Sequence, residues 1–135
     1  MMTFKQFIEN KSMLEWVKPC WIHAINKTLN VPDKQIQELG VKNGWDGKSS
    51  GAPIHIVISI VWDLIGKAPD LTLTKAAKGM TPKEVSSSNL VKNKTGLVFT
   101  KQHVMPLVNG QVSNFNGHGE EQILAIATFD PKDKK

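Results

Sequence analysis

The stretch KQHVMPLVNGQVSNFNG (residues 101–117) decides the fold class that this sequence predicts. Asn109-Gly110 lies between two apolar runs, and this dipeptide is typical of the two-residue turn of a β-hairpin. The pattern therefore predicts strands at 103–108 and 111–115. The first of these strands would begin with His103, which is not a strong strand former. The histidine at this position is a candidate for a chemical role.

Apolar runs on either side of the hairpin extend it to a sheet. GLVFT (96–100) precedes it and ILAIATF (123–129) follows it, and both are divided from it by polar residues. Upstream, apolar residues recur at helical spacing. Helices are predicted at 3–16, 20–29, 34–39, 54–65 and 72–79, and a further short helix or turn is predicted to start at residue 81. Thr3 is the expected N-cap of the first helix, Pro19 precedes the second, and Gly40 is expected to end the third. Thr81-Pro82-Lys83-Glu84 has the spacing of a capping box. Helices first and an antiparallel sheet after them define an α+β domain, expected to span residues 1–135 as one unit.

The β-branched residues of 54–65 also suit a buried strand, although the length of the run favours a helix. Residues 43–53 are rich in glycine and serine and predict a long loop. The four tryptophans are expected in the core because each buries a large area. Trp45 lies in the loop, where it would either fix the loop to the body or bind a ligand.

Composition excludes several classes of function. The formal charge of +5 comes from 17 basic residues, all of them lysine, so the planar guanidinium that reads guanine is missing. Specific nucleic-acid recognition is therefore not expected, although weak salt-dependent binding through lysines stays open. No apolar run approaches the 18 or more residues of a membrane span, and the N-terminus has no secretory signal pattern. With one cysteine the chain cannot form an internal disulfide, which fits a cytoplasmic protein. The lysine-rich C-terminus, 132–135, is expected to fray.

The only cysteine lies where a helix is predicted to start. A helix N-terminus and a nearby imidazolium can lower a cysteine pKa from about 8.5 to roughly 3.5–7.5. From the Asn109-Gly110 turn, His103 and Asn114 both fall towards the open end of the hairpin. A residue on one strand can orient a histidine ring on the partner strand, as the third member of a catalytic triad does. Cys20, His103 and Asn114 are the candidate catalytic residues.

The segments PCWIHAI, at the head of a helix, and HVMPLVNGQVSNF resemble the papain-like cysteine peptidase superfamily. The likeness is greatest to its small members, those similar to bacteriocin-processing peptidases and to short phage-encoded domains. The resemblance implies a papain-like fold with Cys20 as nucleophile, His103 as base and Asn114 as the orienting residue. It implies no cofactor or metal, a peptide or protein as substrate or partner, and, for a phage-encoded member, the host cytoplasm. Residues 14–18 hold no glutamine, so the Cys20 N–H is the expected oxyanion donor, with Lys18 as a second candidate.

The function predicted on this basis is hydrolysis or acyl transfer at an amide or thioester carbonyl through an acyl-cysteine. The alternative from another class is a catalytically inactive, small basic interaction protein on the same scaffold, of the kind that phages use to modulate a host. Each residue also has a structural interpretation: Cys20 as a buried apolar side chain, His103 as an edge-strand residue, and Asn114 as part of a turn. A zinc site of Cys20, His23, His103 and His118 is a further alternative.

Overall fold

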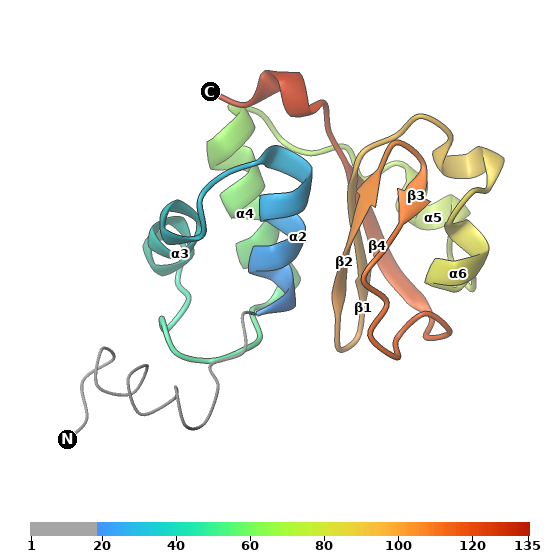
Figure 1. Cartoon of the computed structure of the whole chain (residues 1–135), viewed down its shortest axis with the longest axis horizontal. Helices are drawn as coiled ribbons and strands as arrows, with labels where there is room; N and C mark the ends of the chain where they lie inside the picture. Colours follow the sequence, from blue (N-terminus) through green and yellow to red (C-terminus); the bar gives the residue numbers. More distant parts are fainter. Residues whose placement is uncertain (1–18) are drawn as a thin grey trace.

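The computed structural model describes residues 19–135, and the predicted helix at 3–16 lies outside them. Helices on both sides of an antiparallel sheet make up the described chain (Figure 1). Three helices lie on one side: α2 (Cys20–Leu29), α3 (Asp33–Lys42) and α4 (Ile54–Ile65). The short helices α5 (Leu73–Ala76) and α6 (Pro82–Val85) lie on the other side, and single 3-10 turns occur at η1 (Asn89–Val91) and η2 (Pro131–Asp133). The α+β class is confirmed, with helices before the sheet in the chain.

The hairpin predicted from Asn109-Gly110 is at one edge of this sheet. Within the described residues the strand order is β3-β2-β1-β4, and all neighbours are antiparallel. The strands are β1 (Gly96–Thr100), β2 (Val104–Val108), β3 (Gln111–Val112) and β4 (Ile123–Thr128). Asn109 and Gly110 have φ of 52° and 84°. Positive φ at both central positions is the requirement of a type I′ turn, which matches the twist of the strands that it joins.

The sheet is buried on both faces, and alternate residues of β1 face different cores. Leu97 and Phe99 pack with the apolar sides of α2, α3 and α4. Val98, between them, packs with Val85 of α6 and with Ala77, which directly follows α5. The period of two in strand side chains produces this division. A sheet covered on both faces explains why β1 is an uninterrupted buried run.

The predicted boundaries of two hairpin strands are wrong by a few residues. His103 lies one residue before β2, which begins at Val104. The third strand ends at Val112 and does not reach residue 115. Asn114 and Asn116 have φ of 62° and 47°, a left-handed conformation that cannot continue a strand. The residues after Val112 therefore leave the sheet, and Asn114 and Asn116 come to line the same cavity as Cys20 and His103.

Gly40 does not stop the helix predicted at 34–39, because α3 continues to Lys42. A Cβ at this glycine would lie 3.1 Å from the ring of Trp21 and 3.1 Å from that of Trp45. The glycine is inside the helix because two tryptophan rings pack against its backbone. Their centroids are 5.0 Å apart at 82°, an edge-to-face arrangement. Trp45 is thus buried and fixes the loop to the body, as one of its two interpretations predicted.

Other local predictions are confirmed. The helix at Ile54–Ile65 forms with its predicted bounds and ends at Gly66 in the left-handed conformation. Thr81 and Glu84 form the reciprocal pair of a capping box. Among residues 19–135, no helix combines the length and hydropathy that crossing a membrane requires.

Two expectations for the surface are wrong. Trp62 is not in the core, since 52% of it is exposed on α4. The C-terminus does not fray but lies against the helices. The main-chain N–H of Lys135 donates to the carbonyl of Leu64 at 2.9 Å, and Asp133 pairs with Lys67 at 2.8 Å.

Candidate functional site

Cys20 is the first residue of α2, immediately after Pro19. The proline fixes φ and lacks an N–H, so the helix begins here without losing a hydrogen bond. The thiol is half-buried and faces the start of β2. The backbone N–H of Val104 donates to Cys20 Sγ at 3.4 Å, across 84 residues of sequence. The fold therefore places the only cysteine beside the residue that follows His103.

The pKa of the Cys20 thiol is raised above its ordinary value, mainly because burial disfavours the thiolate. Backbone N–H groups of Val104, Trp21 and Cys20 itself act in the opposite direction but do not offset burial. The sequence-based expectation of a lowered pKa is therefore wrong in direction. The helix N-terminus does stabilise the thiolate, yet its effect is smaller than the cost of desolvation. At neutral pH the thiol needs a base to remove its proton.

His103 is the candidate base, because it directly precedes Val104, whose N–H contacts the sulfur. It is 6% exposed, and its carbonyl accepts the N–H of Thr100 at 2.9 Å, which closes the turn between β1 and β2. Its Nε2 lies 2.8 Å from the carbonyl oxygen of Asn114. A carbonyl oxygen only accepts, so this contact assigns the proton of the neutral ring to Nε2. Nδ1 is then the nitrogen of the neutral ring that carries a free lone pair.

Asn114 meets His103 through its main chain, not through the side-chain amide that the triad interpretation requires. The contact is possible because the chain has left the sheet after Val112 and Asn114 adopts φ of 62°. A backbone carbonyl can hold an imidazole tautomer as an amide oxygen does. The position predicted from the sequence does contact His103, but through a main-chain atom that every residue carries.

Replacement of Asn114 by glycine tests which atom orients the ring. Glycine keeps the carbonyl and accepts the positive φ, so the rate at which iodoacetamide alkylates Cys20 at neutral pH should fall by less than about threefold. Asn116→Gly is the matched control, since Asn116 also has positive φ and lines the same cavity. A fall as large as that of His103→Ala would assign the orienting role to the Asn114 amide.

Cys20 and His103 lie where two cavities meet. The two cavities, of about 440 and 540 Å³, share four lining residues: Cys20, Gly51, Gln102 and His103. One, the apolar cavity, has walls that include Ala52, Pro53, Ile54, Phe99 and Leu124. The other, the polar cavity, is lined also by His23, Ser50, Asn114, Asn116 and His118. A bound molecule that spans both cavities would pass the sulfur.

A β-bulge contributes to the apolar cavity. Phe99 pairs with Ala125 and Thr100 with Ile123, so Leu124 is an extra residue in β4. The extra residue breaks the alternation of the strand and lets Leu124 and Ala125 turn to the same side. Leu124 is 52% exposed where it lines the cavity next to Cys20.

His118 and Glu121 belong to the site and were not predicted as catalytic residues. The ring of His118 stacks on that of His103, with centroids 4.6 Å apart and planes at 21°. His118 Nδ1 lies 2.6 Å from Glu121 Oε2. The pKa of Glu121 is lowered below its ordinary value, mainly by the hydrogen bond with His118 and to a smaller extent by one with Thr100. The spacing of His118 and Glu121 could have indicated their pairing, because a His-x-x-Glu pair in a turn can interact locally. The stacking of His118 on His103 is a tertiary contact that spacing does not indicate.

The zinc alternative finds no support in the described part of the chain. Cys20, His23, His103 and His118 all line the polar cavity. Even so, among residues 19–135 no three or more histidine, cysteine or acidic side chains converge on a point where a metal ion could bind. The contact of His103 and His118 is face to face, with ring planes nearly parallel. Two rings that bind one metal ion instead point their nitrogens at a common centre.

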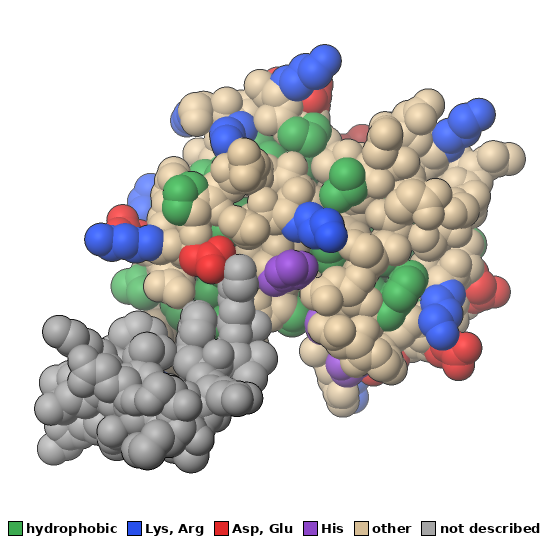
Figure 2. Space-filling model, in the orientation of Figure 1, with side chains coloured by type: hydrophobic (Ala, Val, Ile, Leu, Met, Phe, Trp, Pro, Cys, Tyr) green, Lys and Arg blue, Asp and Glu red, His purple; other side chains and the backbone are tan. Residues whose placement is uncertain are grey.

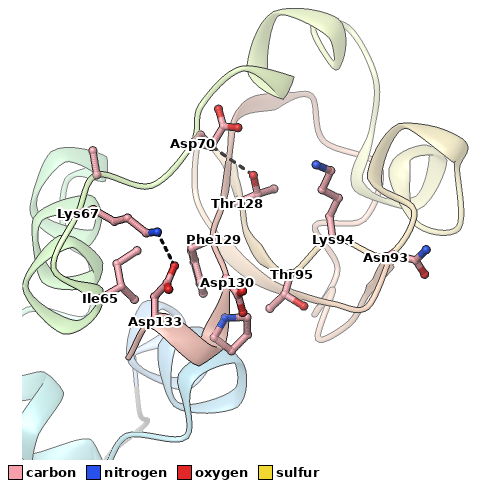
Figure 3. A pocket seen from close by; sticks show the side chains of 12 residues that line it. Ile65, Lys67, Asp70, Asn93, Lys94, Thr95, Thr128, Phe129, Asp130 and Asp133 are labelled. Carbon is pink, nitrogen blue, oxygen red and sulfur yellow. Dashed lines mark hydrogen bonds and ion pairs between the residues drawn. The ribbon is translucent and has the colours of Figure 1, made fainter. Parts of the chain in front are cut away.

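A third cavity, of about 400 Å³, lies at the other end of β1 (Figure 3). Its walls combine Lys67, Asp133, Lys94 and Asp70 with apolar residues such as Phe129. Figure 3 shows the ion pair of Lys67 and Asp133 on one side of it and Lys94 on the other side. Lys67 and Asp133 neutralise each other in this ion pair. Neither Cys20 nor His103 lines this cavity.

Lysine side chains are spread over the face of the molecule in Figure 2 and do not gather in one patch, while histidines appear where the helices meet the sheet.

No known protein family matches the chain, and no curated protein or solved structure is significantly similar to it. The geometry of Cys20, His103 and their neighbours is the feature of the described residues that bears on a function.

Proposed function

We propose that this domain is a papain-like cysteine hydrolase or acyl transferase with Cys20 as nucleophile and His103 as base. The observation that carries the proposal is the position of Cys20 and His103 in two shared cavities, with Nε2 of the histidine bound to the Asn114 carbonyl and Nδ1 left as the basic atom. The nearness of the sulfur to the Val104 N–H supports it. A nucleophile, a base and a group that orients the base are the parts that acyl transfer requires.

The reaction begins with transfer of the thiol proton from Cys20 to Nδ1 of His103 as sulfur attacks the carbonyl carbon of an amide or thioester. The S–C bond forms, and the carbonyl oxygen takes the negative charge of the tetrahedral intermediate. The backbone N–H groups of Val104, Trp21 and Cys20, which stabilise negative charge at the sulfur, are the candidate donors for that oxygen. Collapse breaks the bond to the leaving group, and the His103 imidazolium protonates the departing amine or thiolate.

The acyl-cysteine then reacts with water or with an amine. His103 takes a proton from this second nucleophile as it attacks, and the proton returns to the sulfur when the S–C bond breaks. The raised pKa of the thiol favours this general-base route over a preformed thiolate–imidazolium pair, because the resting thiol holds its proton. The proposed substrate is a peptide or protein.

A second candidate is a catalytically inactive interaction protein on the same scaffold. The raised pKa of Cys20 is the observation that favours it, since a protonated, half-buried thiol is a poor nucleophile. The two candidates differ in whether His103 can remove the proton.

Alkylation of Cys20 by iodoacetamide, measured against pH, separates them. The chain has one cysteine, so the signal has one source. At neutral pH, wild type should react at least about tenfold faster than His103→Ala, because the base assists loss of the proton. At pH values above the raised pKa of the thiol the two rates should converge, since the thiol then ionises without the histidine.

The matched control is His55→Ala, which removes an exposed histidine from α4 that lines neither cavity. It should react like wild type at every pH. Equal rates for wild type and His103→Ala at neutral pH would refute the enzyme and leave the interaction protein.

A further inference from the structure

The ring of His103 needs two constraints before Nδ1 can point steadily at one partner. The contact of Nε2 with the Asn114 carbonyl, at 2.8 Å, fixes one atom of the ring. A single hydrogen bond leaves the plane of the ring free to turn about the N–H···O direction. The polar cavity beside the ring, of about 540 Å³, offers room for such a movement.

The second constraint is the face of His118. The two rings are nearly parallel, at 21°, with centroids 4.6 Å apart. A stacked ring blocks tilting of its neighbour, because any rotation of the plane brings atoms into overlap. His118 itself is partly exposed, with 26% of its side chain accessible, while His103 is buried. The outer ring therefore covers the inner one on the cavity side.

Glu121 holds the outer ring in place. Its Oε2 lies 2.6 Å from Nδ1 of His118, and the backbone between them is closed by the Glu121 N–H, which donates to the His118 carbonyl at 3.2 Å. The N–H of His118 donates to the Phe115 carbonyl at 2.8 Å, so the turn is tied at both ends. The lowered pKa of Glu121 keeps its carboxylate ionised at neutral pH.

We infer that His118, held by Glu121, is a positioning residue that fixes the plane of the His103 ring so that Nδ1 can take the proton of Cys20. The inference rests on the proposed function, because it assigns no chemistry of its own to His118. Contacts join Glu121 to His118 and His118 to His103, and His103 shares two cavities with Cys20. The arrangement combines three segments: the loop before β4, the residue before β2, and the start of α2.

Titratable and charged groups around the stack come from several neighbouring elements. They are Cys20 and His23 of α2, Lys101 of the turn before His103, Glu120 and Glu121 of the loop, and Lys83 of α6, which pairs with Glu120. The pH dependence of the Glu121 contact has a definite sign. A carboxylate with a lowered folded pKa stabilises the pair above its unfolded pKa of about 4.3, and the contribution is lost as the pH falls through the folded value. At neutral pH the pair is therefore intact.

The test measures Cys20 alkylation by iodoacetamide from weakly acidic to strongly basic pH in the full chain. In His118→Ala the rate at neutral pH should fall about five- to tenfold, because a misplaced base loses much of its effect. At pH values above the raised pKa of the thiol the loss should shrink below twofold, since the thiol then ionises without a base. A merely structural disturbance of the cavity would lower the rate equally at every pH.

Two further variants test the stack itself. His118→Phe keeps a ring on the face of His103 and should restore at least half of the loss at neutral pH. Glu121→Ala removes the carboxylate that contacts His118 Nδ1, and it should lower the alkylation rate less than His118→Ala does. His55→Ala, on α4, is the control for loss of a histidine, and thermal unfolding followed by circular dichroism confirms that each variant is folded.

The outcomes separate this inference from the proposed function. If His103→Ala slows alkylation while His118→Ala matches wild type, His118 has no positioning role and the proposed function stands. A uniform fall in His118→Ala at all pH values, or no recovery in His118→Phe, also overturns the inference. If His103→Ala itself has no effect, the proposed function fails and the inference fails with it.

Discussion

Gly96→Ala is expected to lower the free energy of unfolding by more than about 3 kcal/mol. Gly96 begins β1 and pairs with Thr128 of β4. A Cβ at this position would lie 1.9 Å from the carbonyl oxygen of Ala127 and 2.7 Å from the Cα of Thr128. Both are main-chain atoms of the partner strand, so no side-chain rotation can relieve the overlap. Either β4 must move or the pairing at this end of the sheet must break.

Urea unfolding followed by tryptophan fluorescence measures the effect. Gly51→Ala is the control, because a Cβ at Gly51 would meet no atom within 4 Å and the residue has no positive φ. It should change the free energy of unfolding by less than about 0.5 kcal/mol. A loss below about 1 kcal/mol for Gly96→Ala would mean that β4 shifts at little cost, and that close strand contact is not what requires this glycine.

Trp21→Ala is expected to lower the free energy of unfolding by about 3–5 kcal/mol. Trp21 is 1% exposed, and its ring packs edge-to-face on Trp45 and against the backbone of Gly40 in α3. Truncation leaves a cavity between α2, α3 and the loop at residues 43–53. Because Trp21 directly follows Cys20, the variant should also loosen the start of α2.

Trp62→Ala is the matched control for this tryptophan. Trp62 is 52% exposed on α4, so its removal should cost less than about 1 kcal/mol. Both variants are compared by urea unfolding followed by circular dichroism, which does not depend on the fluorophores removed. Similar losses for Trp21→Ala and Trp62→Ala would contradict the assignment of the α2–α3 contact as a main source of stability.

Local chemistry made most of the secondary structure predictable. Asn109-Gly110 specified the hairpin because both residues adopt positive φ at low cost, as the turn requires. The capping box at Thr81 depends on atoms only three residues apart, and α4 forms where a largely apolar segment of helical length begins after a proline. These elements were predictable because their causes lie within a few neighbouring residues.

The predictions that were wrong depended on contacts between distant segments. A glycine usually ends a helix, but Gly40 continues one because Trp21 and Trp45 need the space of a missing side chain. The pKa of Cys20 moved opposite to expectation because burial by the sheet outweighs the helix N-terminus. Neither burial nor ring packing can be read from local spacing.

By itself the sequence determined an α+β chain with the hairpin at Asn109-Gly110, and it indicated Cys20, His103 and Asn114 as candidates. Tertiary structure alone decided how they meet: the Val104 N–H on the sulfur, the carbonyl of Asn114 on Nε2, and His118 stacked on the ring. The reason is physical. Turns and caps are fixed by bonds among adjacent residues, whereas the contacts of the site join residues that are 11 to 84 positions apart in the sequence.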